Sequence, residues 1–268
     1  TEDQTTNGYG ALFITATGGT TSTCGDYKYH KFTGPGTFTV CSVGNPAGSD
    51  TVQVLVVAGG GAGTNNGSGG GGAGGLRNIS GTPVTATGYP ITVGGGGATG
   101  PSCSILCTTD GSPSTALAIT STGGGRGGIA TNASPQPYHS GNPGGSGGGG
   151  SGNARPAFGG TGNTPPVSPP QGNDGGNPAG PGVSGGGGGG ASQAGQTGTA
   201  PGPNQGDGGD GGAGTDVSAS FPAPLGGSPG GYYAGGGGGA ANNDGGTAFA
   251  GGAGGIGGGG NGGGTPGP

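Results

Sequence analysis

The sequence predicts a mostly non-regular fold: a small N-terminal antiparallel β unit, followed by a bundle of packed polyglycine-II helices joined by turns, with essentially no α-helix. Three observations predict it. Glycine supplies 87 of the 268 residues and comes in uninterrupted runs such as 69–72, 185–190 and 235–239. The strongest strand patterns lie in the first sixty residues. No segment shows the apolar periodicity of an amphipathic helix.

The N-terminal unit, residues 1–58, is expected to contain several short strands. Residues 11–16 predict the first, and residues 27–32 alternate, with Tyr27 and Tyr29 on one face. Residues 33–36 read as a turn, with 37–40 as its return strand. Residues 51–58 form a continuous run rich in β-branched residues, which favours a strand buried on both faces. The expected core is Phe32, Phe38, Val54, Leu55, Val56 and Val57.

The remaining residues, 59–268, alternate glycine runs with short interruptions. Polyglycine-II helices have three residues per turn and no internal hydrogen bonds, so neighbouring helices must pair their backbone groups. Two interruptions, 83–93 and 114–120, still predict strands. The others read as turns that send the chain back, at 131–143, 153–178, 193–205 and 216–229.

Composition excludes several classes of function. Five basic residues and a net charge of −5 argue against nucleic-acid binding, which needs lysines and arginines on phosphates. No apolar run is long enough for a transmembrane helix, and no signal peptide is visible. The chain lacks methionine and starts at Thr1, which predicts a processed or trimmed piece.

Four cysteines suggest an oxidising, extracellular setting, and three pairings of them are possible. We favour Cys24–Cys41 and Cys103–Cys107, because each pair brackets a short segment; four free thiols are the alternative. A zinc site is disfavoured, since no Cys-x-x-Cys pair exists.

No set of acid, base and nucleophile stands out, so we expect neither an enzyme nor a bound cofactor. One weak metal signal exists. Residues 211–217 fit a single calcium-binding repeat of β-rolls, and this makes Asp207, Asp210 and Asp216 candidate calcium ligands. A single match is expected by chance in a glycine-rich chain, and β-rolls stack several repeats.

Aromatic residues in the interruptions are the candidate receptor-binding residues: Tyr138, His139, Phe158 and Phe221. Aromatic faces can stack on sugars or fill receptor pockets. Alternatively, these rings cover the ends of glycine helices as small satellite cores. Tyr138 and His139, flanked by Pro137 and Asn142, are expected to be the most exposed, whereas Tyr232 and Tyr233 precede a glycine run and are expected to be structural.

The sequence landmarks resemble a known family. His-Lys-Phe-Thr-Gly-Pro-Gly-Thr-Phe-Thr-Val at 30–40 is followed by Val-Leu-Val-Val-Ala-Gly-Gly-Gly at 54–61 and Tyr-Pro-Ile-Thr-Val-Gly at 89–94. This pattern is similar to the glycine-rich domain of tail-fibre and other virion proteins of tailed phages, including cyanophages. It also resembles tip adhesins whose polyglycine-II helices form a sandwich. The chain lacks the closing Gly-Ser-Gly-Ile-Val-Ile-Ile-like strand that such domains often carry.

The resemblance implies a virion-surface or extracellular protein, such as a tail fibre or tip that mediates host attachment. Its implied partners are other fibre or virion proteins in an oligomeric assembly, and a host surface glycan or outer-membrane protein. The runner-up is a non-binding decoration or filament subunit. Ice binding would need a regular flat face of Thr or Ala, which the irregular interruptions disfavour, and a disordered tether remains the simplest alternative.

Overall fold

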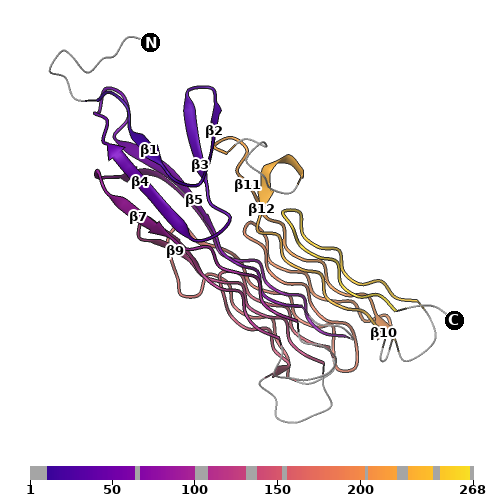
Figure 1. Ribbon diagram of the computed structural model, residues 1–268. Coiled ribbons are helices and arrows are strands. Elements are labelled where there is room, and N and C mark those ends of the chain that lie inside the picture. Colours follow the sequence, from indigo (N-terminus) through magenta and orange to yellow (C-terminus); the bar gives the residue numbers. More distant parts are fainter. Residues whose placement is uncertain are drawn as a thin grey trace.

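Figure 1 shows the computed structural model of the chain, with short β-strands at one end. From them, extended segments run away and back, side by side, toward the opposite end, which we call the far end. The structure describes residues 11–63, 67–99, 108–130, 138–152, 156–202, 205–221, 229–243 and 248–265.

The strands form several small sheets, and every pairing is antiparallel. The largest sheet has the order β1-β4-β7, with β1 at Thr15–Thr17, β4 at Gly36–Ser42 and β7 at Gly88–Ile91. Two-stranded sheets pair β2 (Thr20–Cys24) with β3 (Tyr27–Lys31), β5 (Thr51–Val57) with β6 (Leu76–Pro83), β8 (Ser114–Ala116) with β9 (Ile119–Ser121), β10 (Gln205–Gly206) with β13 (Asn242–Asn243), and β11 (Thr215–Asp216) with β12 (Tyr232–Tyr233).

The expectation of a mostly non-regular, essentially helix-free chain is confirmed for the residues that the structure describes. The helical element named among them is a short 3-10 turn, η4, at Pro229–Gly231. Within the described residues, no helix has the length and apolar character needed to cross a membrane.

The apolar core lies at the end of the molecule that carries the largest sheet, opposite the far end; we call it the β end. Phe38 and Val40 of β4 point to the same side and are 8 % and 2 % exposed. They pack with Ala16 of β1, Ile91 of β7 and Val84, so one cluster joins all three strands of the largest sheet. Phe32 packs against this cluster half-buried. The sheet is therefore held by the period-two burial that alternation in strands produces.

Strand pairing corrects three sequence predictions. First, β3 and β4 do not form a hairpin: β3 pairs with β2, and β4 pairs with β1 and β7. Gly18 and Gly19 cause this, because both have positive φ (105° and 63°) and turn the chain out of the β1 sheet into β2. Second, 114–120 is a hairpin, since Leu117 and Ala118 have left-handed backbones (φ 47° and 62°) between β8 and β9.

Third, β5 is not fully buried on both faces. Val54 and Val56 are buried, whereas Leu55 and Val57 are half-buried and Gln53 is exposed. Its partner β6 was not predicted, because Leu-Arg-Asn-Ile-Ser-Gly-Thr-Pro carries no clean apolar alternation. β6 and β7 lie beyond residue 58, so strands from the second predicted unit complete the sheets of the first. The division at residue 58 itself stays a prediction.

Backbone hydrogen bonds, rather than side chains, join the glycine-rich segments. In segment 185–190 the N–H groups donate to three neighbouring segments in turn, and each neighbour is met again three residues later. The pairs are Gly185–Ala240 and Gly188–Gly237, Gly186–Gly150 and Gly189–Gly147, and Gly187–Gln196 and Gly190–Gln193, with N···O distances of 2.8–3.0 Å.

The carbonyl groups of the same segment accept hydrogen bonds from three further segments, again at a spacing of three residues. These donors are Gly209 and Gly212, Gly70 and Ala73, and Asn173 and Gly176. Segment 185–190 is thus surrounded on all sides by backbone, which satisfies its polar groups without a side chain.

The close approach of these backbones explains why glycine is required. At every position of 185–190 a Cβ atom would collide with a neighbouring backbone carbonyl; at Gly188, for example, it would meet the oxygen of Gly71. The buried side chains between the segments are correspondingly small. They include Ala62, Ala73, Ala240, Ala241, Ser68, Ser146, Ser151 and Ser184, each at most 4 % exposed.

Candidate functional site

Three of the four candidate receptor-binding residues, Tyr138, His139 and Phe158, lie close together near the far end. The Phe158 N–H donates to Ser140 Oγ at 3.1 Å, and the Phe158 carbonyl accepts from the Gly141 N–H at 2.9 Å. These bonds set residues 156–162 beside residues 138–144. We call Tyr138, His139 and Phe158 the far-end aromatic group.

Exposure differs sharply within this group. Phe158 is 59 % exposed, Tyr138 is half-buried, and His139 is only 3 % exposed. The expectation that His139 would be among the most exposed residues is therefore wrong. The reason is that its carbonyl accepts from the Ser151 N–H at 2.8 Å, so residue 139 already belongs to the packed glycine-rich body rather than to the preceding turn.

Tyr138 is held by Arg126, which stands in the middle of a glycine run. The Arg126 guanidinium carbon lies 5.7 Å from the centre of the Tyr138 ring, and Nη1 donates to the Gly127 carbonyl at 3.2 Å. Arg126 is 9 % exposed. Burial lowers the pKa of this guanidinium, and the negative charge of Asp110 partly opposes that shift.

Asp110 ties this region together through its carboxylate. Oδ1 accepts from the backbone N–H of Arg126 at 2.8 Å, and both carboxylate oxygens accept from Asn142 Nδ2 at 3.1 Å. Sequence reasoning did not assign a role to Arg126 or Asp110. The available signal was a single charged residue inside the glycine run 123–128. A charge is costly to bury unless it is paired and hydrogen-bonded, so partners for Arg126 could have been sought.

Phe221 does not belong to the far-end aromatic group. Its ring lies 6.2 Å from that of Tyr29 on β3, and Tyr29 in turn lies 6.4 Å from Tyr27. Phe221 follows β11, which lies near the β2–β3 hairpin at the β end (Figure 1). The structure therefore separates Phe221 from the other candidates by the length of the glycine-rich segments. Tyr232 and Tyr233 form β12 and are half-buried.

The candidate calcium ligands each accept a hydrogen bond from a backbone N–H group. Asp207 Oδ1 accepts from Ala250 and Asp210 Oδ1 from Ala253, both at 2.7 Å. Asp216 Oδ1 accepts from Ser218 at 2.8 Å, and this hydrogen bonding lowers the pKa of the carboxyl. In the described part of the chain, no three His, Cys, Asp or Glu side chains gather to hold a metal ion.

These carboxylates replace backbone carbonyls at the margins of the glycine-rich body. Asp174 Oδ1 accepts from the Gly162 N–H at 2.7 Å, and Asn177 and Asn261 accept in the same way from Gly159 and Gly254 at 3.0 and 2.8 Å. Acidic and amide residues are thus placed where a segment lacks a neighbouring carbonyl to pair with.

The favoured Cys24–Cys41 disulfide is wrong. Both thiols are free and exposed, because Cys24 ends β2 in the projecting β2–β3 hairpin whereas Cys41 lies in β4 of a different sheet. The other predicted pair, Cys103–Cys107, lies outside the described residues.

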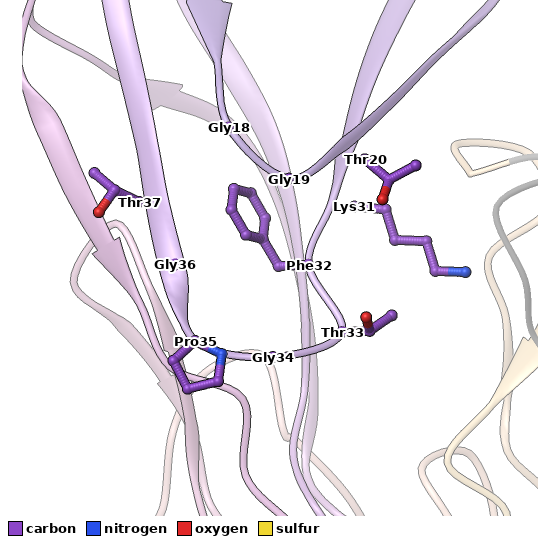
Figure 2. Close-up of a pocket in the computed structure, with 10 residues that line it drawn as sticks. All are labelled: Gly18, Gly19, Thr20, Lys31, Phe32, Thr33, Gly34, Pro35, Gly36 and Thr37. Atoms are coloured by element: carbon purple, nitrogen blue, oxygen red, sulfur yellow. The ribbon is translucent and has the colours of Figure 1, made fainter.

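An open hollow of about 370 Å³ lies beside the turn at 33–36. Figure 2 shows the Phe32 ring between the Gly18–Gly19 backbone and Gly36, while Lys31, Thr33 and Thr37 point away from it. A Cβ on Gly36 would stand 3.1 Å from the Phe32 ring, so the ring fills the space between these glycines. Polar groups do not converge in this hollow, and it offers no specific chemistry.

Comparison with known proteins gives the family. Residues 31–268 match the glycine-rich domain, so the chain belongs to this family of glycine-rich domains. No curated protein and no solved structure matches the chain.

Proposed function

We propose that the glycine-rich segments are polyglycine-II helices packed side by side as a bundle. The support is the three-residue repeat of hydrogen-bond partners, since polyglycine II has three residues per turn and no internal hydrogen bonds. The collisions that a Cβ would cause along 185–190 agree with this packing, because only glycine lets such helices approach at backbone distance.

We further propose that the chain is a virion-exposed fibre or adhesin protein, such as a phage tail fibre or tip, and acts at the virion surface or outside the cell. The observation that carries this is the far-end aromatic group: Phe158 stands 59 % exposed on a body that backbone hydrogen bonds hold. A large exposed ring on a rigid support loses little entropy on binding, which favours recognition.

The proposed ligand is a glycan or an outer-membrane protein on the host surface. Phe158 offers an aromatic face, and the hydroxyl-bearing Tyr138 lies near it with its ring fixed by Arg126. This chemistry suits stacking on a sugar with hydrogen bonds at its rim. Other virion or fibre proteins are the proposed structural partners. We propose binding without catalysis and without a cofactor.

A non-binding decoration or filament subunit is the second candidate. The burial of His139 favours it, because that leaves a smaller exposed aromatic surface at the far end than the sequence suggests. In this alternative the turns only keep the bundle soluble.

The test compares Phe158→Ala with Ile256→Ala. Ile256 is also an exposed apolar residue, at 45 %, but its carbonyl binds Gly214 next to β11 at the β end. Fluorescently labelled protein would be titrated onto a glycan array and onto a panel of bacterial cells. For an adhesin, Phe158→Ala is expected to weaken binding at least about tenfold, a typical loss for an anchor residue, whereas Ile256→Ala leaves it unchanged.

Equal effects of the two variants would contradict a binding site at the far end. No binding by the unmodified chain to any cell or glycan would favour the decoration or filament subunit.

A further inference from the structure

In the part of the chain that the structure describes, no segment fills one backbone position on a face of the glycine-rich body. Segment 68–75 is flanked by 58–63, through Gly61 N–H to the Gly72 carbonyl at 2.8 Å, and by 234–241, through Gly237 N–H to the Gly71 carbonyl at 2.9 Å. Segment 234–241 in turn binds 257–263. Among the described residues, no hydrogen bond joins 58–63 to 257–264. We call the surface between these two segments the open face.

At Gly60, Gly63 and Gly260, which border the open face, packing within the chain leaves room for a Cβ atom. A Cβ on Gly60 would come no closer than 3.5 Å to another atom, on Gly63 no closer than 3.4 Å and on Gly237 no closer than 3.3 Å. On Gly260 it would meet nothing within 4 Å. Segment 185–190 is the opposite case, with a collision at every position. Since glycine costs backbone entropy relative to alanine, its presence here points to contact with something outside the chain.

The floor of the open face carries unused hydrogen-bond donors. The backbone N–H groups of Gly71 and Gly74 find no acceptor in the described part of the chain, although both residues are buried. Buried backbone donors are almost always paired. The two donors stand three residues apart, which is the spacing at which segment 185–190 bonds its neighbours. Their missing partner is therefore an extended backbone with carbonyls at the same spacing.

The absence of charged residues on the open face allows a second copy of the chain to bind there. Each copy carries a net charge of −5, so two copies repel except where their contact is free of charge. Segments 58–63, 68–75, 234–241 and 257–264 contain no charged residue. The acidic side chains that bind the glycine-rich body, such as Asp110, Asp174 and Asp207, stand on other segments.

We propose that the open face binds segment 257–264 of a second copy of this chain. Residues 258, 260, 261, 263 and 264 of that segment are exposed, the others are half-buried, and 258–264 carry no bulky side chain. The carbonyls of Asn261 and Gly264, three residues apart, accept no hydrogen bond from the described chain. They match the donors of Gly71 and Gly74. The contact is reciprocal, because each copy offers both the open face and the segment, and so it closes as a dimer.

This inference rests on backbone hydrogen bonds, the room at glycine Cβ positions and the absence of charge at the open face, and not on the proposed attachment role, so either can fail without the other. The test is sedimentation velocity of the whole chain across micromolar to millimolar concentrations. A concentration-dependent dimer is expected. Gly260→Glu puts a charged side chain on the open face where the monomer has room for it, and should raise the dimer dissociation constant at least about 30-fold.

The matched control is Gln193→Glu, which adds the same charge at an exposed position on a different segment and should leave the dissociation constant unchanged. Melting at low concentration checks that both variants fold. Amide exchange reports the contact directly: the Gly71 and Gly74 amides should exchange more slowly as the dimer forms in the unmodified chain, and should not in Gly260→Glu. A chain that stays monomeric at all concentrations, or equal effects of the two variants, would overturn the proposal.

Discussion

Gly188 and Gly95 are chemically the same residue in different surroundings. At Gly188 a Cβ would overlap the carbonyl oxygen of Gly71, whereas at Gly95 it would find no atom within 4 Å. Neither residue has the left-handed backbone that only glycine adopts easily. The difference between them is thus one of space: a neighbouring backbone occupies the Cβ position at Gly188, and no atom of the described chain lies near it at Gly95.

This difference predicts opposite effects of alanine. Gly188→Ala should lower the free energy of unfolding by about 2–3 kcal/mol, since the backbones must move apart to admit the methyl group. Gly95→Ala should raise it by about 0.4–1 kcal/mol, because alanine restricts the unfolded chain. Urea unfolding followed by tyrosine fluorescence measures both. Similar effects of the two substitutions would mean that the close backbone contacts do not exist in solution.

At the scale of the element, side-chain oxygens at the margin of the glycine-rich body accept hydrogen bonds from backbone N–H groups that have no neighbouring carbonyl to pair with. Segment 207–214 is joined to 249–256 by two kinds of bond. Backbone bonds run from Gly208 to Ala250 and from Gly211 to Ala253, and the carboxylates of Asp207 and Asp210 accept the N–H groups of the same two alanines. Both kinds of bond repeat every three residues, so the two aspartates occur at the same interval as the backbone hydrogen bonds.

If Asp210 is a hydrogen-bond acceptor and not a calcium ligand, Asp210→Ala should cost about 1 kcal/mol of stability, whereas Asp210→Asn, which keeps the Oδ1 acceptor, should cost much less. Thermal unfolding with added calcium and with a chelator completes the measurement. The melting temperature should be the same in both. A rise with calcium that Asp210→Asn abolishes would restore Asp207 and Asp210 as metal ligands.

The strands show which elements a pattern of residues can predict. β4 is recognisable because Phe38 and Val40 stand two residues apart, and β5 because residues 51–58 form a continuous run rich in β-branched residues, of which Val54 and Val56 are buried. β6 carries no such repeat and becomes a strand through its pairing with β5. The β2–β3 hairpin was missed because Gly18 and Gly19 redirect the chain, and two glycines in so glycine-rich a sequence do not stand out.

On the scale of the whole molecule, stability comes from a network of backbone bonds spread over segments far apart in the sequence. Gly186, for example, donates to Gly150 and accepts from Gly70. Loop closure over such separations is costly, and the gain comes only when many segments are in place. The glycine-rich body is therefore expected to form cooperatively.

Hydrogen exchange tests the network of backbone bonds at single residues. Amides of 185–190, all paired, should exchange several orders of magnitude more slowly than those of Ala194 and Thr197, which are exposed and have no backbone acceptor among the described residues. Mass spectrometry or amide NMR resolves the two groups. Uniformly fast exchange in 185–190 would instead support the disordered tether.

The candidate site was predictable only in part. Phe158 was identified as an aromatic residue in an interruption, and the structure leaves it exposed. The same reasoning misjudged His139, because a residue in a polar, proline-rich stretch gives no sign that its carbonyl will pair with Ser151. It also grouped Phe221 with residues at the opposite end, since the end at which a turn lies depends on how many segments precede it.

The sequence by itself determined the composition of the fold: glycine runs that disfavour α-helices and side-chain cores, and an N-terminal region able to form strands. These are local properties, set by the presence or absence of side chains at each residue. Only the tertiary structure decided which segments pair, which thiols stay free and which glycines are crowded. A glycine run carries no side chain to distinguish one partner from another, so its neighbours are selected by the packing of the whole chain.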